Sequence, residues 1–105
     1  MEKVAFISGA NRGIGFETAK KLAEKGIKVI LGSRDLNKGK EALEKLSSQG
    51  LDVDLVQYDA FDPESPQRVF DHIQKNYQKL DILINNAGVL LTGNLFVTNS
   101  STVSD

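Results

Sequence analysis

The sequence contains no cysteine and only one histidine among its 105 residues. The lack of cysteine excludes disulfides, thiolate nucleophiles and thiolate metal sites, and a single histidine cannot form a His-rich metal site. Long apolar runs are also missing at the N-terminus. The first run ends at Ile7, far short of a signal peptide or of the ~20 apolar residues of a membrane-spanning helix. We therefore expect a cytoplasmic protein without a membrane partner.

Neither sign of charge dominates the chain. Thirteen Lys and Arg residues oppose fourteen Asp and Glu residues, which gives a formal net charge of −1. The sequence has no polybasic tail, and we expect no nucleic-acid partner. Apolar residues make up 40% of the chain and charged residues 26%, which is the balance of a soluble globular protein, and the length suits one domain.

The apolar residues indicate alternating strands and helices. Residues 4–7 form a continuous apolar run, typical of a strand buried on both faces of a parallel sheet. Further strands are predicted at residues 27–31, 53–58 and 80–84. Helices are predicted at residues 13–25, at 36–46 and from either Asp62 or Ser65 to Tyr77. This order predicts a doubly wound α/β fold, with four parallel strands in the order 3-2-1-4 and three helices joined by right-handed crossovers.

The spacing of apolar residues also predicts which face of each helix is buried. The expected inward positions are Ile14, Thr18, Ala19, Leu22 and Ala23 in the first helix, Leu36, Gly39, Leu43 and Leu46 in the second, and Val69, Phe70, Ile73 and Tyr77 in the third. Gly26 and Gly50 are predicted to end the first two helices. His72 lies off the third stripe and is predicted to be a solvated surface residue. Tyr58 and Tyr77 are predicted to pack rather than to act as acids.

A glycine-rich segment, residues 8–15 (SGANRGIG), lies between the first strand and the first helix. Glycine permits a tight turn, close approach of the backbone to a phosphate and close packing of helix on strand. The helix N-terminus then presents free N–H groups and the positive end of its dipole to an anion. The spacing, G-x3-G-x-G, differs from G-x-G-x-x-G and from the G-x4-G-K-[ST] loop. The segment predicts a dinucleotide phosphate site, with a purely structural turn as the alternative.

Three motifs in order resemble the short-chain dehydrogenase/reductase family. Residues 8–15 resemble its T-G-x-x-x-G-I-G cofactor loop, with Ser8 keeping the hydroxyl of the usual threonine. Residues 85–88 (NNAG) resemble its N-N-A-G motif, and Asp59 matches the acidic residue that contacts adenine in the family. The resemblance covers about residues 3–89. It implies a Rossmann-type dinucleotide-binding unit over residues 1–89.

The residues after the second strand favour NADP over NAD as the cofactor. NAD-preferring proteins carry an acidic residue there, whereas this chain has Ser33 followed by Arg34. The resemblance implies that Arg34 and Arg12 flank the 2′-phosphate of NADP. Alternatively, Arg34 only decorates the start of a helix and Arg12 an exposed turn. Asp35 is assigned to capping the second helix.

The predicted cofactor-binding residues are Ser8, Gly9, Asn11, Arg12, Gly13, Ile14, Gly15, Ser33, Arg34, Asp59, Asn85, Ala87 and Gly88. No metal-binding residue is predicted. Asn85 and Gly88 also have a structural role, because the family uses this turn to stabilise the central sheet close to the cofactor.

The family's catalytic Tyr-x-x-x-Lys pair has no counterpart in the sequence. Tyr58 is followed four residues later by Asp62, and Tyr77 by Asp81, so no catalytic residue is assigned. The resemblance implies an oxidoreductase that transfers hydride between NADP(H) and a small carbonyl or alcohol substrate, with a homo-oligomeric full-length form.

We expect these 105 residues to be the truncated, cofactor-binding portion of such an enzyme, inactive alone. Residues 90–105, half of which are Ser, Thr or Asn, are expected to be a loop or disordered tail leading to an absent helix. A self-standing nucleotide-binding module and a structural piece without catalysis remain as alternatives.

Overall fold

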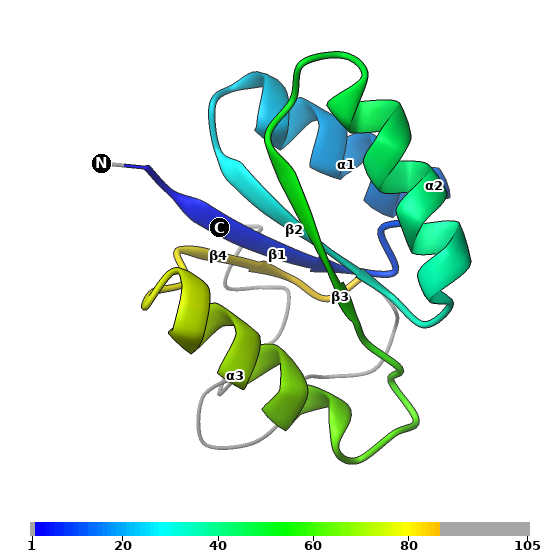
Figure 1. The fold of residues 1–105 in the computed structure, drawn as a ribbon, viewed down its shortest axis with the longest axis vertical. Coiled ribbons are helices and arrows are strands. Elements are labelled where there is room, and N and C mark those ends of the chain that lie inside the picture. Colours follow the sequence, from blue (N-terminus) through cyan, green and yellow to red (C-terminus); the bar gives the residue numbers. More distant parts are fainter. Residues whose placement is uncertain (1, 87–105) are drawn as a thin grey trace.

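A parallel sheet of four strands forms the centre of the molecule (Figure 1). The computed structural model describes residues 2–86 of the chain. In chain order its elements are β1 (Val4–Ser8), α1 (Gly13–Glu24), β2 (Lys28–Ser33), α2 (Leu36–Ser47), β3 (Val53–Gln57), α3 (Ser65–Asn76) and β4 (Ile82–Ile84). The strands pair in the order β3-β2-β1-β4. The predicted doubly wound fold and its strand order are therefore confirmed.

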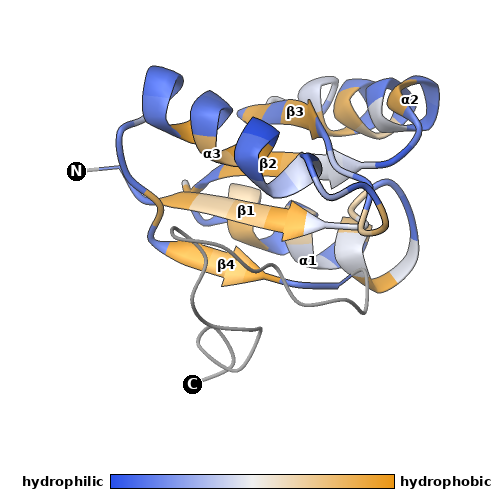
Figure 2. Cartoon of the chain, turned by 90° about the horizontal axis from the view of Figure 1, so that it is seen from below, coloured by the Kyte–Doolittle hydropathy of each residue, from blue (hydrophilic) through white to orange (hydrophobic). Residues whose placement is uncertain are grey.

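Helices cover both faces of the sheet: α1 and α2 lie on one face and α3 on the other (Figure 1). β1 is consequently buried along its whole length and β2 along nearly all of it, which explains their continuous apolar sequences. The core under α1 and α2 contains Ile7, Ala10, Ala19, Ala23, Val29, Leu31, Ala42 and Leu46. The core under α3 contains Val4, Phe6, Ile30, Val56, Tyr58, Val69, Ile73 and Leu83. In Figure 2, β1 and β4 are coloured mainly as hydrophobic, whereas α3 is mainly hydrophilic.

Small residues line the buried faces of α1 and α2. The buried positions are Gly15, Ala19 and Ala23 in α1 and Gly39, Ala42 and Leu46 in α2. A Cβ at Gly39 would lie 2.7 Å from a methyl carbon of Leu55, so glycine allows α2 to pack closely on β3. The inward positions predicted for Ile14 and Leu36 are wrong, because their side chains are 79% and 39% exposed. Ile14 is one residue, or about 100°, away from the stripe that begins at Gly15.

Several element boundaries differ from the predicted ones. β2 continues to Ser33, which pairs with Gln57, whereas the strand was predicted to end at Leu31. β4 begins at Ile82, whereas the strand was predicted to begin at Leu80. Asp81 just before it donates its N–H to the Val4 carbonyl at 2.9 Å and accepts the Val4 N–H through its carboxylate at 2.8 Å. Gly26 and Gly50 follow their helices with φ of +86° and +81°, as predicted.

The third helix begins at Ser65, the second of the two predicted starts, with Pro66 in its first turn. Ser65 is nevertheless not a capping residue, because Glu64 occupies the N-cap position. The Ser65 hydroxyl oxygen instead accepts a hydrogen bond from the N–H of Asp59, at 3.0 Å. None of the helices in the described part is long and apolar enough to cross a membrane. Ala87, Gly88 and the tail predicted at residues 90–105 lie outside the described residues.

Candidate functional site

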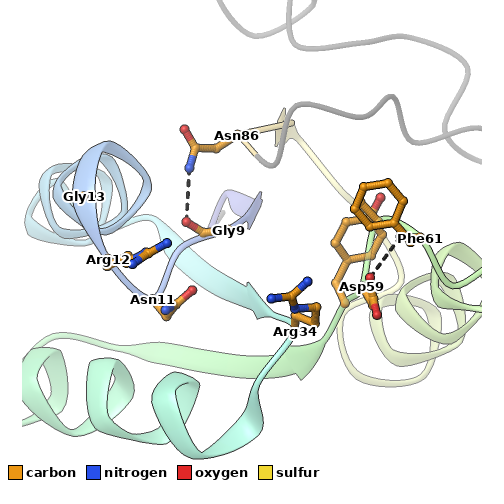
Figure 3. Close-up of a pocket in the computed structure, with 10 residues that line it drawn as sticks. Gly9, Asn11, Arg12, Gly13, Arg34, Asp59, Phe61 and Asn86 are labelled. Carbon is orange, nitrogen blue, oxygen red and sulfur yellow. Dashed lines mark hydrogen bonds between the residues drawn. The ribbon is translucent and has the colours of Figure 1, made fainter.

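Loops at the carboxyl ends of all four strands line a hollow of about 450 Å³ (Figure 3). Ligands of open α/β sheets bind at this end of the strands. Of the predicted cofactor residues, the hollow brings together Gly9, Asn11, Arg12, Gly13, Arg34 and Asp59. A second hollow of about 370 Å³ shares Asn11, Arg12 and Arg34 and adds Ser33. Residues from three separate stretches of sequence therefore meet at one edge of the sheet.

The loop after β1 requires glycine at two positions because of its backbone conformation. The φ angles of Gly9 and Gly13 are +64° and +63°, a region that strains residues with a Cβ. The N–H of Ala10 donates to the carbonyl of Gly32 at 3.0 Å, which holds the loop against the end of β2. The loop is thus bonded to the end of β2 and leads directly into α1.

Gly15 is required for space rather than for conformation. A Cβ at this position would lie 2.4 Å from the carbonyl oxygen of Gly9 and 2.6 Å from Nδ2 of Asn86. Both distances are shorter than the contacts that Cβ atoms make with other heavy atoms in proteins. Only glycine lets α1 approach the loop this closely.

Two asparagines after β4 support the loop from the other side. The hydroxyl of Ser8 donates to Oδ1 of Asn85 at 3.1 Å, and Nδ2 of Asn86 donates to the carbonyl of Gly9 at 3.1 Å (Figure 3). Ser8 is fully buried. Asn86 also lines the larger hollow, although it was not among the predicted site residues. Its place within the N-N-A-G motif was the signal that could have identified it.

The N-terminus of α1 faces the loop without a capping side chain. Arg12 is the N-cap residue, its backbone is extended, and within the described residues no side chain forms a capping hydrogen bond there. The first turn of α1 contains no acidic residue. Free N–H groups and the positive end of the helix dipole make such a terminus suitable for an anionic group.

Three cationic side chains line the smaller hollow beside this terminus: Arg12, Arg34 and Lys38. Among residues 2–86, none of the three forms an ion pair. Lys38 was not predicted as a site residue. The available signal was its place in the first turn of the helix that follows Arg34. The three cations outnumber Asp35, the one carboxylate among the lining residues, so the lining of this hollow carries a net positive charge.

Asp35 and Ser33 line the same hollow as these cations, and both form hydrogen bonds to nearby residues of the chain. Oδ1 of Asp35 accepts from the N–H groups of Asn37 at 2.9 Å and Lys38 at 3.3 Å, so the predicted cap of the second helix is confirmed. Ser33 is buried, and its hydroxyl donates to the carbonyl of Asp35 at 2.8 Å. The carboxylate of Asp35 thus serves the N-terminus of α2.

The turn after β3 forms the far wall of the larger hollow. Oδ1 of Asp59 accepts from the N–H of Phe61 at 2.9 Å (Figure 3). Tyr58 is buried, and its ring meets that of Phe6 edge-on at a centroid distance of 6.0 Å, so its predicted packing role is confirmed. Burial, and then the charge of Asp59, raise the pKa of Tyr58, which keeps the phenol neutral.

His72 is not the solvated surface residue that was predicted. Its Nε2 lies 2.6 Å from Oδ2 of Asp54, and the hydroxyl of Tyr77 donates to the same oxygen at 2.7 Å. Burial acts to raise the pKa of Asp54, but the hydrogen bonds from His72, Tyr77 and the Leu55 N–H outweigh it and hold the pKa below 3.8. This cluster joins β3 to α3 and does not line either hollow.

The described residues offer no alternative metal centre. Within residues 2–86, no group of three or more His, Cys, Asp or Glu side chains is arranged to hold a metal ion.

The strand order and the glycine turn after β1 define a Rossmann-type α/β protein. A family model described as short chain dehydrogenase matches residues 3–104. The chain belongs to this family of oxidoreductases.

Curated relatives match most of this chain but only part of their own length. (+)-Neomenthol dehydrogenase of Arabidopsis thaliana is 44% identical over 92 residues, which cover 83% of this chain and 31% of the relative. Carbonyl reductase (NADPH) 1 of Mus musculus is 40% identical over 87 residues, with 82% and 31% covered. The chain thus spans about a third of the length of these relatives.

Solved structures show the same fold. Salutaridine reductase from Papaver somniferum has a TM-score of 0.80 at 44% identity and covers 85% of this chain and 31% of its own. L-sorbose reductase from Gluconobacter frateurii, solved in complex with NADPH and L-sorbose, has a TM-score of 0.78 at 29% identity, with 96% and 39% covered.

Proposed function

We propose that residues 1–89 bind NADP and form the cofactor-binding portion of an oxidoreductase that transfers hydride between NADP(H) and a small carbonyl or alcohol substrate. The observation that carries the proposal is the group of three cations, Arg12, Arg34 and Lys38, next to the uncapped start of α1. A 2′-phosphate is the feature by which NADP differs from NAD. Phosphate recognition by arginine and lysine is the chemistry that this group offers.

The residues present fit the cofactor along the whole hollow. The glycine loop and the first turn of α1 would hold the pyrophosphate, because in the described residues α1 begins without a capping side chain and without an acidic residue in its first turn. The cations would hold the 2′-phosphate, and the turn at Asp59 would receive the adenine end. The cofactor itself supplies the hydride, while these residues bind and orient its adenosine half.

NAD is the less favoured cofactor because β2 ends at Ser33, the position where NAD-binding proteins carry an acidic residue for the ribose diol. The carboxylate of Asp35 lies two residues further on, and its Oδ1 accepts the N–H groups of Asn37 and Lys38 at the start of α2. Two relatives also support NADP: a mouse carbonyl reductase that is named for NADPH, and L-sorbose reductase, which was solved in complex with NADPH.

Isothermal titration of the 105-residue chain with NADP⁺ and NAD⁺ at equal ionic strength tests this proposal. Each charge-assisted hydrogen bond contributes roughly 1.5–3 kcal/mol, so Arg34→Ala should weaken NADP⁺ binding by about 10- to 100-fold and leave NAD⁺ nearly unchanged. Lys40→Ala, an exposed position on α2 outside both hollows, removes the same charge and should have little effect. Tighter NAD⁺ binding, or no binding of either dinucleotide, would overturn the proposal.

We further propose that these residues alone do not catalyse the reaction. Neither tyrosine has a lysine four positions later, so the phenol and ammonium pair that the family uses for proton transfer is missing from this stretch. The chain should bind NADPH without oxidising it in the presence of a ketone. Turnover by the 105-residue chain would contradict this point. Binding without catalysis by a longer natural form would favour a nucleotide-binding module instead.

A further inference from the structure

The most exposed large apolar side chain of the described residues lies at the edge of the larger hollow. Phe61 is 81% exposed and lines this hollow together with Arg34 and Asp59. Isolated apolar residues on a surface are common and mean little alone. This ring, however, lies beside a ligand-sized hollow, on a turn that hydrogen bonds hold in place.

Hydrogen bonds fix the turn that carries Phe61. Its N–H donates to Oδ1 of Asp59, and the N–H of Asp62 donates to the carbonyl of Asp59 at 3.0 Å. The N–H of Asp59 donates in turn to the hydroxyl oxygen of Ser65, which is fully buried. The backbone of Phe61 is therefore tied to the first residue of α3.

Arg68 joins this network from the next turn of α3. Its guanidinium donates to the hydroxyl oxygen of Ser65 at 3.0 Å and pairs with the carboxylate of Asp62 at 3.3 Å. Both ends of the turn at residues 59–62 are thus bonded to one helix. An exposed ring on so constrained a turn loses little conformational freedom when it contacts a ligand.

Phe61 and Arg34 offer two flat groups to the same hollow. Figure 3 shows Arg34 between the glycine loop and the turn of Asp59 and Phe61. Aromatic rings and guanidinium planes are the surfaces on which proteins stack nucleobases. Tyr58 also lines the hollow, but its ring is buried against Phe6. Phe61 is therefore the exposed aromatic ring of the lining, and Arg34 is the guanidinium beside it.

We propose that Phe61 binds the adenine base of the dinucleotide by stacking, and that Ser65 and Arg68 position it through the turn at residues 59–62. This inference rests on the proposed function. It assigns base recognition to the ring of Phe61, beyond the carboxylate of Asp59, which already accepts the N–H of Phe61.

Two probes separate base stacking from phosphate binding. Adenosine 2′,5′-bisphosphate carries the base and both phosphates, whereas ribose 2,5-bisphosphate carries the phosphates alone. Stacking on one aromatic ring is worth enough that Phe61→Ala should weaken the adenosine probe by about 5- to 150-fold. Phe61→Leu, which keeps apolar area without a ring, should show an intermediate loss. Affinity for ribose 2,5-bisphosphate should not change in either variant.

A fluorescence readout tests the contact directly. The chain contains no tryptophan, so Phe61→Trp introduces a single indole at this position. Its emission should be quenched by adenosine 2′,5′-bisphosphate and not by ribose 2,5-bisphosphate. The thermal midpoint of Phe61→Ala should equal that of the wild type, because the side chain is largely exposed.

The outcomes distinguish this inference from the proposed function. If the wild type binds adenosine 2′,5′-bisphosphate and Phe61→Ala binds it equally well, the stacking role is wrong while NADP binding stands. Equal losses for both probes would indicate a structural role for Phe61 and also overturn the inference. If the wild type binds neither probe, the proposed function fails and the inference fails with it.

Discussion

Replacing Gly15 by alanine sets helix propensity against close packing, because the two effects have opposite signs at this position. Gly15 lies within the first turn of α1. Helix propensity alone predicts that alanine stabilises the folded chain by about 1 kcal/mol. The added Cβ, however, would lie 2.4 Å from the carbonyl oxygen of Gly9 and 2.6 Å from Nδ2 of Asn86.

The packing cost should exceed the gain in propensity. Overpacking of this kind typically costs about 1–3 kcal/mol. Relief of the clash would also displace the hydrogen bond from Asn86 to the Gly9 carbonyl, worth about 1 kcal/mol. After subtraction of the helix term, Gly15→Ala should lower the free energy of unfolding by about 1–3 kcal/mol.

Urea unfolding followed by far-ultraviolet circular dichroism measures this difference, provided that the slope with denaturant is unchanged. Gly13→Ala is the comparison, because nothing lies within 4 Å of its Cβ and only its φ of +63° is strained. That variant should lose about 1–2 kcal/mol. An unfolding midpoint of Gly15→Ala equal to or above that of the wild type would refute the packing argument.

Two further predictions concern side-chain hydrogen bonds. Asp35→Ala should lower the free energy of unfolding by about 1 kcal/mol, because its carboxylate caps α2; Asp35→Asn, which keeps a capping oxygen, should lose less, and equal urea midpoints for the three proteins would argue against the cap. Hydrogen bonds from His72 and Tyr77 hold the pKa of Asp54 below 3.8, so its contribution to stability is present above this value and is lost as the pH falls through the folded-state pKa. Asp54→Asn should flatten the decline of the urea midpoint in acid, and an unchanged decline would contradict this role.

The sequence was sufficient for those features that depend on neighbouring residues. The run at residues 4–7 indicates a strand covered on both faces, and alternating elements then leave few topologies. The glycine loop and the cap at Asp35 are also local, since each uses residues within one turn of chain. These features were predicted correctly.

Contacts between distant elements account for what the sequence did not reveal. His72 was expected in solvent, but its partner, Asp54, lies 18 residues away on a neighbouring strand. Phe61 showed no periodicity that marks a site, and it meets Arg34 only because β2 and β3 are neighbours. The exposure of Ile14 follows from where the small residues of α1 contact the sheet.

The proposed NADP site lies at the carboxyl ends of β1, β2 and β3. Titration of the ¹⁵N-labelled 105-residue chain with NADP⁺, followed by NMR shifts of the backbone amides, would show residue by residue where the cofactor binds. The largest shifts should fall at residues 9–15, 33–38 and 59–61. A titration that leaves these amides unmoved, or shifts centred on Asp54 and His72, would contradict NADP binding at this site.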